Sequence, residues 1–455
     1  MPLSFDGQRI LILGAGVTGN AVARSLVKRG AAVSFADENP VAKSEHTVID
    51  AKNVVIKDFD SVVVSPGWRQ DHPLVVAAMA AGLTLLNEVD LAWQIKSEMA
   101  PGQKWLALTG TNGKTTTVEM VAAMLKSGGL KATACGNVGE TVIEVVDRSD
   151  AFDVLVLELS SFQLHWSKQA QFVACAILNI ADDHIDWHGS FDAYAKAKLT
   201  ILDRATTAVL NASDGEILKR SSHWQGRKVF YSLETPAPGE IGLVEELLVD
   251  RAFVQDPQEA SMFAELAEVK PTIPHNVSNT LAAAALARTV GVSHEDIRSA
   301  IKAFRPGRHR IETVHTADSI NWVDDSKATN PHAATASLLS HESVIWIAGG
   351  LAKGAAMEEL VERTAKRIKA AILIGTDRAL IEAALIKFCP DVPRVLIDGD
   401  SSQELMEKVV SAAQGFAQSG DTVLLAPACA SMDQFVSYAD RGDRFAAAVK
   451  KVVSK

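Results

Sequence analysis

WLALTGTNGKTTTV, residues 105–118, joins an apolar run to a glycine-rich turn and then to a helical pattern. The run Leu106-Ala107-Leu108 predicts a strand, and apolar residues after the turn recur at the spacing of one helix face, at Val118, Val121, Ala122 and Leu125. Backbone N–H groups of such a turn close around phosphate oxygens at the start of the helix. The sequence therefore predicts a strand, a phosphate-binding loop and a helix.

Within this loop, Lys114 is expected to direct its charge toward terminal phosphates, and Thr115 to hold Mg2+ through its hydroxyl. Leu108 stands where the standard loop has its first glycine, so an ordinary strand-to-helix turn is the alternative interpretation. The flanking strand and helix, with Gly128-Gly129 at the helix end, favour the phosphate loop. The expected nucleotide contacts are Gly110, Thr111, Asn112, Gly113, Lys114, Thr115 and Thr116.

The composition limits the classes of function. A chain of 455 residues with 47% hydrophobic residues suggests about three domains on a prior of roughly 150 residues each. A net charge of -10 opposes binding to nucleic acid or to an anionic membrane surface. The N-terminus lacks a signal-peptide pattern, and the four cysteines form no CxxC motif. We expect a cytoplasmic monomer that binds neither nucleic acid nor membrane.

The first segment, 1–100, begins with a strand pattern at residues 9–13 followed by GAGVTG at 14–19. A second strand pattern ends at Asp37, near the place where an acidic residue takes a ribose hydroxyl. Alone, this GxGxxG predicts a dinucleotide site, but the same backbone holds any diphosphate, including that of a UDP-sugar. Candidate ligand contacts here are Gly16, Thr18, Asp37 and the turn Ser65, Pro66, Gly67.

Metal-capable side chains close two apolar strand patterns of the second segment, 101–305. Glu158 ends the run Val154–Leu157, and His184 follows the next run in the cluster Asp182-Asp183-His184. Because Glu158 interrupts a buried run, we favour Mg2+ coordination over helix capping. For His184 the alternatives are a structural histidine or a zinc pair with His188, and the nearby carboxylates favour a hard cation.

Three further clusters allow more than one interpretation. On spacing alone, Lys196 and Lys198 form a solvated helix face. Asn276 and Asn279 lie at i, i+3, where amides bind a nucleotide or, equally well, Asn276 or Ser278 caps the helix. The segment Asp324–Asn330 is too dense in polar groups for a simple turn, which favours a site, and a surface loop is the alternative. It belongs to the third segment, 306–455, where strand patterns again alternate with helical stretches.

Ten motifs in order resemble the Mur ligases, and within that family the D-glutamate-adding members, over essentially the whole chain. They are GAGVTG, SPG, TGTNGKTTT, ELSSFQL, NIADDHID, AKAKL, HNVSN, RHRIE, DDSKATN and PACASMDQF. The resemblance implies three α/β domains: a Rossmann-like UDP-substrate domain, a central parallel sheet with the ATP loop, and a Rossmann-like amino-acid domain. It also implies ATP, two Mg2+ sites, UDP-N-acetylmuramoyl-L-alanine and D-glutamate.

Residue roles follow from the resemblance alone. Glu158, His184 and a carbamylated Lys198 are expected to hold the second Mg2+, with Lys114, His184, Lys198 and Lys327 in catalytic roles. Expected nucleotide contacts are Asn276, Asn279, Arg310 and Asp325. Expected substrate contacts are Asn137 for the muramoyl part, Ser160, and Thr329, Lys353, Ser431 and Tyr438 around D-glutamate.

The chain also departs from the family pattern. Trp187 replaces a polar residue, Leu351-Ala352 lack an acidic residue, and Tyr438 stands where phenylalanine is common. Rival interpretations are a folylpolyglutamate synthetase, a dinucleotide-dependent oxidoreductase and a non-catalytic nucleotide switch. An oxidoreductase would leave Lys114, Glu158 and His184 without a role, and a switch would need neither Asp325 nor Lys327.

Overall fold

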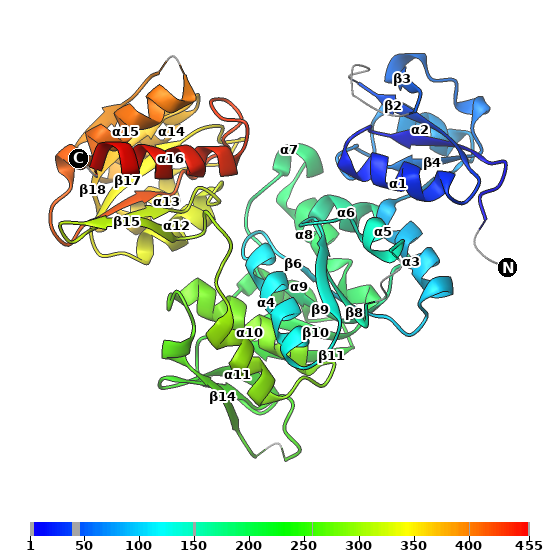
Figure 1. The fold of residues 1–455 in the computed structure, drawn as a ribbon, viewed down its shortest axis with the longest axis horizontal. Helices are drawn as coiled ribbons and strands as arrows, with labels where there is room; N and C mark the ends of the chain where they lie inside the picture. Colours follow the sequence, from blue (N-terminus) through cyan, green and yellow to red (C-terminus); the bar gives the residue numbers. More distant parts are fainter. Residues whose placement is uncertain (1–3, 39–45, 149–151, 257, 400, 454–455) are drawn as a thin grey trace. The chain divides into compact units, whose positions relative to one another are not determined.

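The computed structural model describes residues 4–38, 46–148, 152–256, 258–399 and 401–453 (Figure 1). The chain divides into two compact units. The first comprises residues 1–180, 192–272 and 276–304, and the second comprises 181–191, 273–275 and 305–455. Each unit is described by itself below. In the described ranges no helix is both long and apolar enough to cross a bilayer.

The N-terminal part of the first unit is a five-stranded parallel sheet in the order β3-β2-β1-β4-β5. Its central strands read almost continuously apolar because helices cover them, and Leu11, Leu13, Val62 and Val64 share one core. The elements are β1 Arg9–Leu13, α1 Val17–Val27, β2 Ala32–Asp37, β3 Val48–Asp50, β4 Ser61–Val64, α2 Pro73–Ala80, β5 Thr84–Leu86 and α3 Glu88–Met99.

The second part of this unit is a nine-stranded sheet in the order β14-β13-β12-β11-β10-β9-β6-β8-β7. The seven strands β6 to β12 are parallel to one another. The strands β13 and β14 extend the sheet beyond β12 in antiparallel pairs. The strands are β6 Lys104–Thr109, β7 Ala132–Gly136, β8 Val154–Glu158, β9 Phe172–Ile177, β10 Ala205–Asn211, β11 Arg227–Tyr231, β12 Glu240–Val244, β13 Leu247–Asp250 and β14 Ser261–Glu265. The helices are α4 Lys114–Ser127, α5 Val142–Val146, α6 Ser161–Trp166, α8 Phe191–Leu199, α9 Gly215–Ser221, α10 Pro274–Arg288 and α11 His294–Ala303.

The second unit contains a six-stranded sheet in the order β15-β16-β20-β17-β18-β19, parallel except for the β15–β16 pair. Alternate residues of β17 enter different cores: Val344 and Trp346 face α12 to α14, whereas Ile345 and Ile347 face α15 and α16. The strands are β15 Glu312–Ala317, β16 Ile320–Asp324, β17 Val344–Gly349, β18 Ile368–Ile374, β19 Arg394–Leu396 and β20 Thr422–Leu425. The helices are α7 Ile185–His188, α12 Pro331–Leu339, α13 Glu358–Thr364, α14 Arg378–Phe388, α15 Ser402–Phe416 and α16 Tyr438–Val453.

The predicted α/β class with parallel sheets is confirmed, and the strand patterns at residues 9–13, 154–157 and 344–347 lie within observed strands. The four cysteines are all free and buried. Two of the plainer alternatives are wrong. α10 begins at Pro274, so Asn276 and Ser278 lie inside the helix and do not cap it. Lys198 is buried, so only Lys196 belongs to a solvated face.

Within the first unit, buried carboxylates of α3 join the N-terminal sheet to the central one. Asp90 accepts hydrogen bonds from the Ser167 hydroxyl and from the N–H groups of Lys168, Gln169 and Ala170. These contacts hold the pKa of Asp90 below its usual range against the opposing effect of burial. The Asp90 carboxylate therefore accepts the hydrogen bonds of a whole turn, residues 167–170, and fixes that turn against α3.

Glu88 of α3 makes a second contact of this kind, with α5, and its burial leads us to expect a pH dependence of stability. Its side chain is 3% exposed and accepts the Ile143 N–H at 2.7 Å, and burial raises its pKa to about 7. A raised carboxyl pKa means that stability is full below the unfolded value and falls as pH rises through 7.

We therefore expect Glu88→Gln to exceed the wild type by less than about 1 kcal/mol of unfolding free energy at pH 5, and by about 3 kcal/mol at pH 8. Glutamine retains the acceptor for Ile143 without a charge to desolvate. Melting temperatures of both proteins from pH 5 to 8 check this expectation. A constant difference between the two proteins across that range would contradict it.

Candidate active site

The phosphate loop connects β6 to α4, and hydrogen bonds between its own residues hold it together. The Lys114 ammonium donates to the carbonyl oxygens of Gly110 and Thr111, each at 2.8 Å. Gly113 has φ +80°, and a Cβ there would lie 2.4 Å from Asn279 Oδ1, so the loop requires glycine at this position. The first N–H groups of α4 thus face the loop with a lysine folded over it, as phosphate binding requires.

Asn179, directly beyond β9, braces this loop from the neighbouring strand end. Its Oδ1 accepts the Asn112 N–H at 2.7 Å, and its Nδ2 donates to the Asn112 carbonyl at 3.1 Å. Tyr194 adds a second brace, since its hydroxyl lies 2.9 Å from Thr111 Oγ1. The sequence patterns missed both roles. The signal available for Asn179 was a polar residue closing an apolar strand.

Glu158 lies at the carboxyl end of β8, beside the phosphate loop at the end of β6. It is 2% exposed, and its Oε1 accepts from Asn137 Nδ2 at 2.8 Å. Its Oε2 is buried and has no hydrogen-bond partner among the described residues. A buried carboxylate with one unpaired oxygen is costly unless a cation occupies the site, so this donor fits Mg2+.

Lys198 reaches the same loop from α8. Its side chain is 2% exposed, and Nζ donates to the Gly110 carbonyl at 2.8 Å and lies 4.6 Å from the centre of the Tyr194 ring. Gly110 O therefore receives both Lys114 and Lys198. Two ammonium groups on one oxygen repel each other, and a bound polyphosphate would offset that repulsion.

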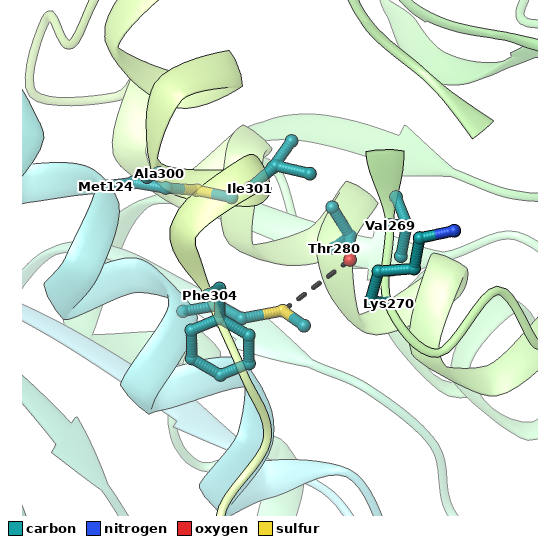
Figure 2. A pocket seen from close by; sticks show the side chains of 8 residues that line it. Met124, Val269, Lys270, Thr280, Ala300, Ile301 and Phe304 are labelled. Atoms are coloured by element: carbon teal, nitrogen blue, oxygen red, sulfur yellow. Dashed lines mark hydrogen bonds between the residues drawn. The ribbon is translucent and has the colours of Figure 1, made fainter. Parts of the chain in front are cut away.

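The expected nucleotide asparagines occupy α10, close to the phosphate loop. Asn276 is buried and donates to the Pro271 carbonyl at 2.9 Å, while Asn279 lies against Gly113. A small cavity elsewhere in this unit is lined by Met120 and Met124 of α4, Thr280 of α10, Ala300 and Ile301 of α11, and Val269, Lys270 and Phe304, and the Thr280 hydroxyl contacts the Met120 sulfur (Figure 2). The mostly apolar lining suits packing rather than phosphate chemistry.

At the N-terminal sheet, the residues predicted to meet the UDP part follow β1, β2 and β4, at the carboxyl ends of adjacent parallel strands. Asp37 Oδ2 accepts the Ala15 N–H at 2.8 Å, so its carboxylate shapes the GxGxxG turn. Gly16 is exposed, Thr18 and Ser65 are half-buried, and Ser160 caps α6. The carboxyl edge of such a sheet is where ligands collect.

His184 belongs to the second unit, with residues 181–191. It has φ +52° and precedes α7, and its Nε2 lies 3.6 Å from Asp183 Oδ2. A left-handed conformation at a histidine is uncommon and is found where a side chain has to be aimed.

In the second unit, three loops leave the carboxyl ends of adjacent parallel strands β16, β20 and β17. Asp324, Asp325 and Ser326 are buried, which overturns the surface-loop interpretation of this segment. Burial raises the pKa of Asp325 to about 7. Lys327 Nζ lies 3.9 Å from the centre of the Tyr438 ring, a cation–π contact. Thr329 is half-buried, Lys353 exposed and Ser431 buried.

Arg441, which the sequence patterns missed, ties these three loops together. Its guanidinium is fully buried and donates to Ser326 Oγ and O at 2.9 Å and to the Cys429 carbonyl at 3.2 Å. It also contacts the Gly349 carbonyl at 3.5 Å. His309 secures the adjacent turn before Arg310 through a 2.7 Å contact of Nδ1 with Asp324, which raises the pKa of the imidazole.

Comparisons with known proteins identify the arrangement. The family model of the Mur ligase middle domain matches residues 108–287, and that of the Mur ligase glutamate ligase domain matches 309–429. UDP-N-acetylmuramoylalanine–D-glutamate ligase of Thermobifida fusca is 46% identical, covering 98% of this chain and 99% of its own length. The relative of the same name from Streptomyces coelicolor is 44% identical, and the match covers 99% of this chain and 100% of the relative.

The chain belongs to the Mur ligase family. Mur ligases use ATP and Mg2+, which fits the phosphate loop and the unpaired Glu158 oxygen. Solved Mur ligases share the fold: UDP-N-acetylmuramate–alanine ligase of Thermotoga maritima superposes with a TM-score of 0.60 at 19% identity over 98% of this chain and 100% of its own. A pseudomurein peptide ligase of Methanothermus fervidus superposes with a TM-score of 0.62 at 18% identity, again over 98% of this chain and 100% of its own.

The Mur ligase site predicted from sequence is only partly assembled in one unit. The structure brings together Gly110, Lys114, Glu158, Lys198 and Asn279 within the first unit. In the second unit, Asp325, Lys327 and Ser431 follow neighbouring strand ends, and Tyr438, the first residue of α16, contacts Lys327. The individual ligand contacts of these residues stay predictions.

Proposed function

We propose that this Mur ligase is an ATP-dependent ligase that adds D-glutamate to the L-alanine carboxylate of UDP-N-acetylmuramoyl-L-alanine in peptidoglycan precursor synthesis. The observation that carries the proposal is a phosphate loop whose neighbouring strand end holds a buried carboxylate with an unpaired oxygen. The relatives named above, which match nearly end to end, supply the substrate pair.

The reaction needs carboxylate activation. The L-alanine carboxylate attacks the γ-phosphorus of ATP and ADP leaves, giving an acyl phosphate. The amine of D-glutamate then attacks the acyl carbon, and phosphate leaves with one former carboxylate oxygen. Lys114 and the N–H groups at the start of α4 stabilise charge on the phosphoryl oxygens. When bound, Mg2+ supplies further charge neutralisation for the phosphate oxygens.

The metal proposal has two sites. Thr115 holds the first Mg2+ with the nucleotide, and Glu158, His184 and carbamylated Lys198 hold the second. Carbamylation turns a cation into a carboxylate-like oxygen ligand. It is supported by the shared contact of Lys114 and Lys198 with Gly110 O, because a carbamate removes the repulsion between two ammonium groups.

Ligand contacts are proposed for three groups of residues. Asn276, Asn279, Arg310 and Asp325 hold the nucleotide, together with residues 110–116. Gly16, Thr18, Asp37, Ser65, Pro66, Gly67, Asn137 and Ser160 hold the muramoyl substrate. Thr329, Lys353, Ser431 and Tyr438 surround D-glutamate, and Lys327 takes a catalytic role beside Tyr438.

The proposed domains are residues 1–100 for the UDP part of the substrate, 101–305 for ATP and 306–455 for the amino acid, and the nucleotide and muramoyl groups each include residues of two of these domains. The enzyme is proposed to act as a monomer in the cytoplasm, where ATP and UDP-activated sugars are made.

The buried guanidinium of Arg441 gives a prediction for the amino-acid site. Lysine cannot reproduce its fork of hydrogen bonds to Ser326 and Cys429. We expect Arg441→Lys to raise the KM for D-glutamate about tenfold and the KM for ATP by less, because among its partners only Ser326 adjoins a proposed nucleotide contact, Asp325. Steady-state kinetics with each substrate varied in turn measure both constants. Equal increases in the two constants would contradict a role confined to the amino-acid loops.

Phosphate release from ATP tests the proposed reaction. With Mg2+, UDP-N-acetylmuramoyl-L-alanine and D-glutamate, release should occur only when both partners are present, and L-glutamate should not replace D-glutamate. Release that ignores the amino acid would contradict the ligase. An unchanged NADH fluorescence on titration excludes the oxidoreductase alternative for the GxGxxG segment.

A further inference from the structure

The loop after β7 and the end of β8 are tied by an unusually close approach. Gly136 pairs with Glu158 across the two strands, and the Asn137 N–H donates to the Glu158 carbonyl at 2.9 Å. Gly136 has φ +102°, and a Cβ there would lie 2.6 Å from Glu158 O. Only glycine therefore brings the loop this near to Glu158.

The side chain of Asn137 completes the contact. Its Nδ2 donates to Glu158 Oε1 at 2.8 Å, which leaves the buried Oε2 as the carboxylate oxygen without a partner in the described part of the chain. A single hydrogen bond to one oxygen fixes the rotation of the carboxylate and so the direction of the other oxygen. The loop itself does not depend on this amide, because the Gly136 N–H also donates to the Glu140 carbonyl at 2.9 Å.

We infer that Asn137 is a positioning residue for the metal carboxylate: its amide holds Oε1 of Glu158 so that Oε2 points to a divalent cation. This inference rests on the proposed metal role of Glu158. It assigns Asn137 a role distinct from, and additional to, its predicted contact with the muramoyl substrate. The two roles are compatible because Asn137 is exposed while Glu158 is buried.

The test measures Mn2+ binding to the full chain in the absence of nucleotide and substrate. The electron paramagnetic resonance signal of free Mn2+ reports how much of the ion is bound. Asn137→Ala should weaken Mn2+ binding about tenfold, as loss of a partner that orients a metal ligand does. Glu158→Gln should weaken it at least as much, which confirms that the signal reports this site. Ser65→Ala, in the proposed muramoyl site, is the matched control and should leave Mn2+ binding unchanged.

The outcomes separate the two claims. If Glu158→Gln weakens Mn2+ binding and Asn137→Ala does not, the positioning role is wrong while the metal site stands. If Glu158→Gln has no effect, the metal site and the inference both fail. A rise in the KM for the muramoyl substrate in Asn137→Ala without a change in Mn2+ affinity would likewise overturn the inference. Because Asn137→Ala removes a hydrogen bond from the buried Glu158 carboxylate, the melting temperature of each variant is recorded, and Mn2+ binding is measured well below it.

Discussion

Replacing Lys114 with alanine is expected to lower kcat by about a thousandfold, because it removes the cation that the loop directs at the phosphoryl group. In the structure its ammonium donates to the carbonyl oxygens of Gly110 and Thr111 within the loop at the start of α4, where phosphates bind. Phosphate release under saturating substrates measures the loss.

Lys126 supplies the matched control for this prediction. It is an exposed lysine in the last turn of the same helix, α4, so Lys126→Ala changes the charge equally without touching the loop. We expect its activity within about twofold of the wild type. An activity in Lys114→Ala above about a tenth of the wild type would contradict a phosphoryl-transfer role for the loop.

The second large effect is expected at Lys198, where alanine should lower activity about a hundredfold or more. The side chain is buried against Gly110 and Tyr194, so the substitution vacates a closed space beside the phosphate loop. If the working form is a carbamate, a small carboxylic acid can enter that space and restore an oxygen ligand. Added formate or acetate should therefore recover part of the activity of Lys198→Ala.

Lys196 on the same helix is the control, because its side chain is exposed. Lys196→Ala should keep full activity and respond to neither acid. Full activity in Lys198→Ala would end the carbamate proposal. The mass of the native protein at raised bicarbonate concentration provides an independent check on the modification.

Local patterns predicted the strands and the phosphate loop because both depend on neighbouring residues. A buried strand requires continuous apolar residues, and the turn at Gly113 requires a left-handed backbone. The pattern around Lys198 failed for the opposite reason. Spacing along α8 cannot distinguish a lysine facing solvent from one facing Gly110, since the difference is set by a strand almost ninety residues earlier.

Arg441 illustrates a second limit. Its partners Ser326, Gly349 and Cys429 lie on three loops that become neighbours only when β16, β20 and β17 pair. A charged residue in a helix favours a solvated face on composition alone. Tertiary pairing, which local periodicity does not encode, makes it a buried organiser of the candidate amino-acid site.

The central claim is that the L-alanine carboxylate is activated by direct attack on the γ-phosphate. Oxygen transfer tests this most directly. With both carboxylate oxygens of UDP-N-acetylmuramoyl-L-alanine labelled with 18O, each phosphate released during D-glutamate addition should carry one labelled oxygen, measured by mass spectrometry or by the 31P isotope shift. Product formed with unlabelled phosphate would contradict the acyl phosphate and the mechanism proposed for this site.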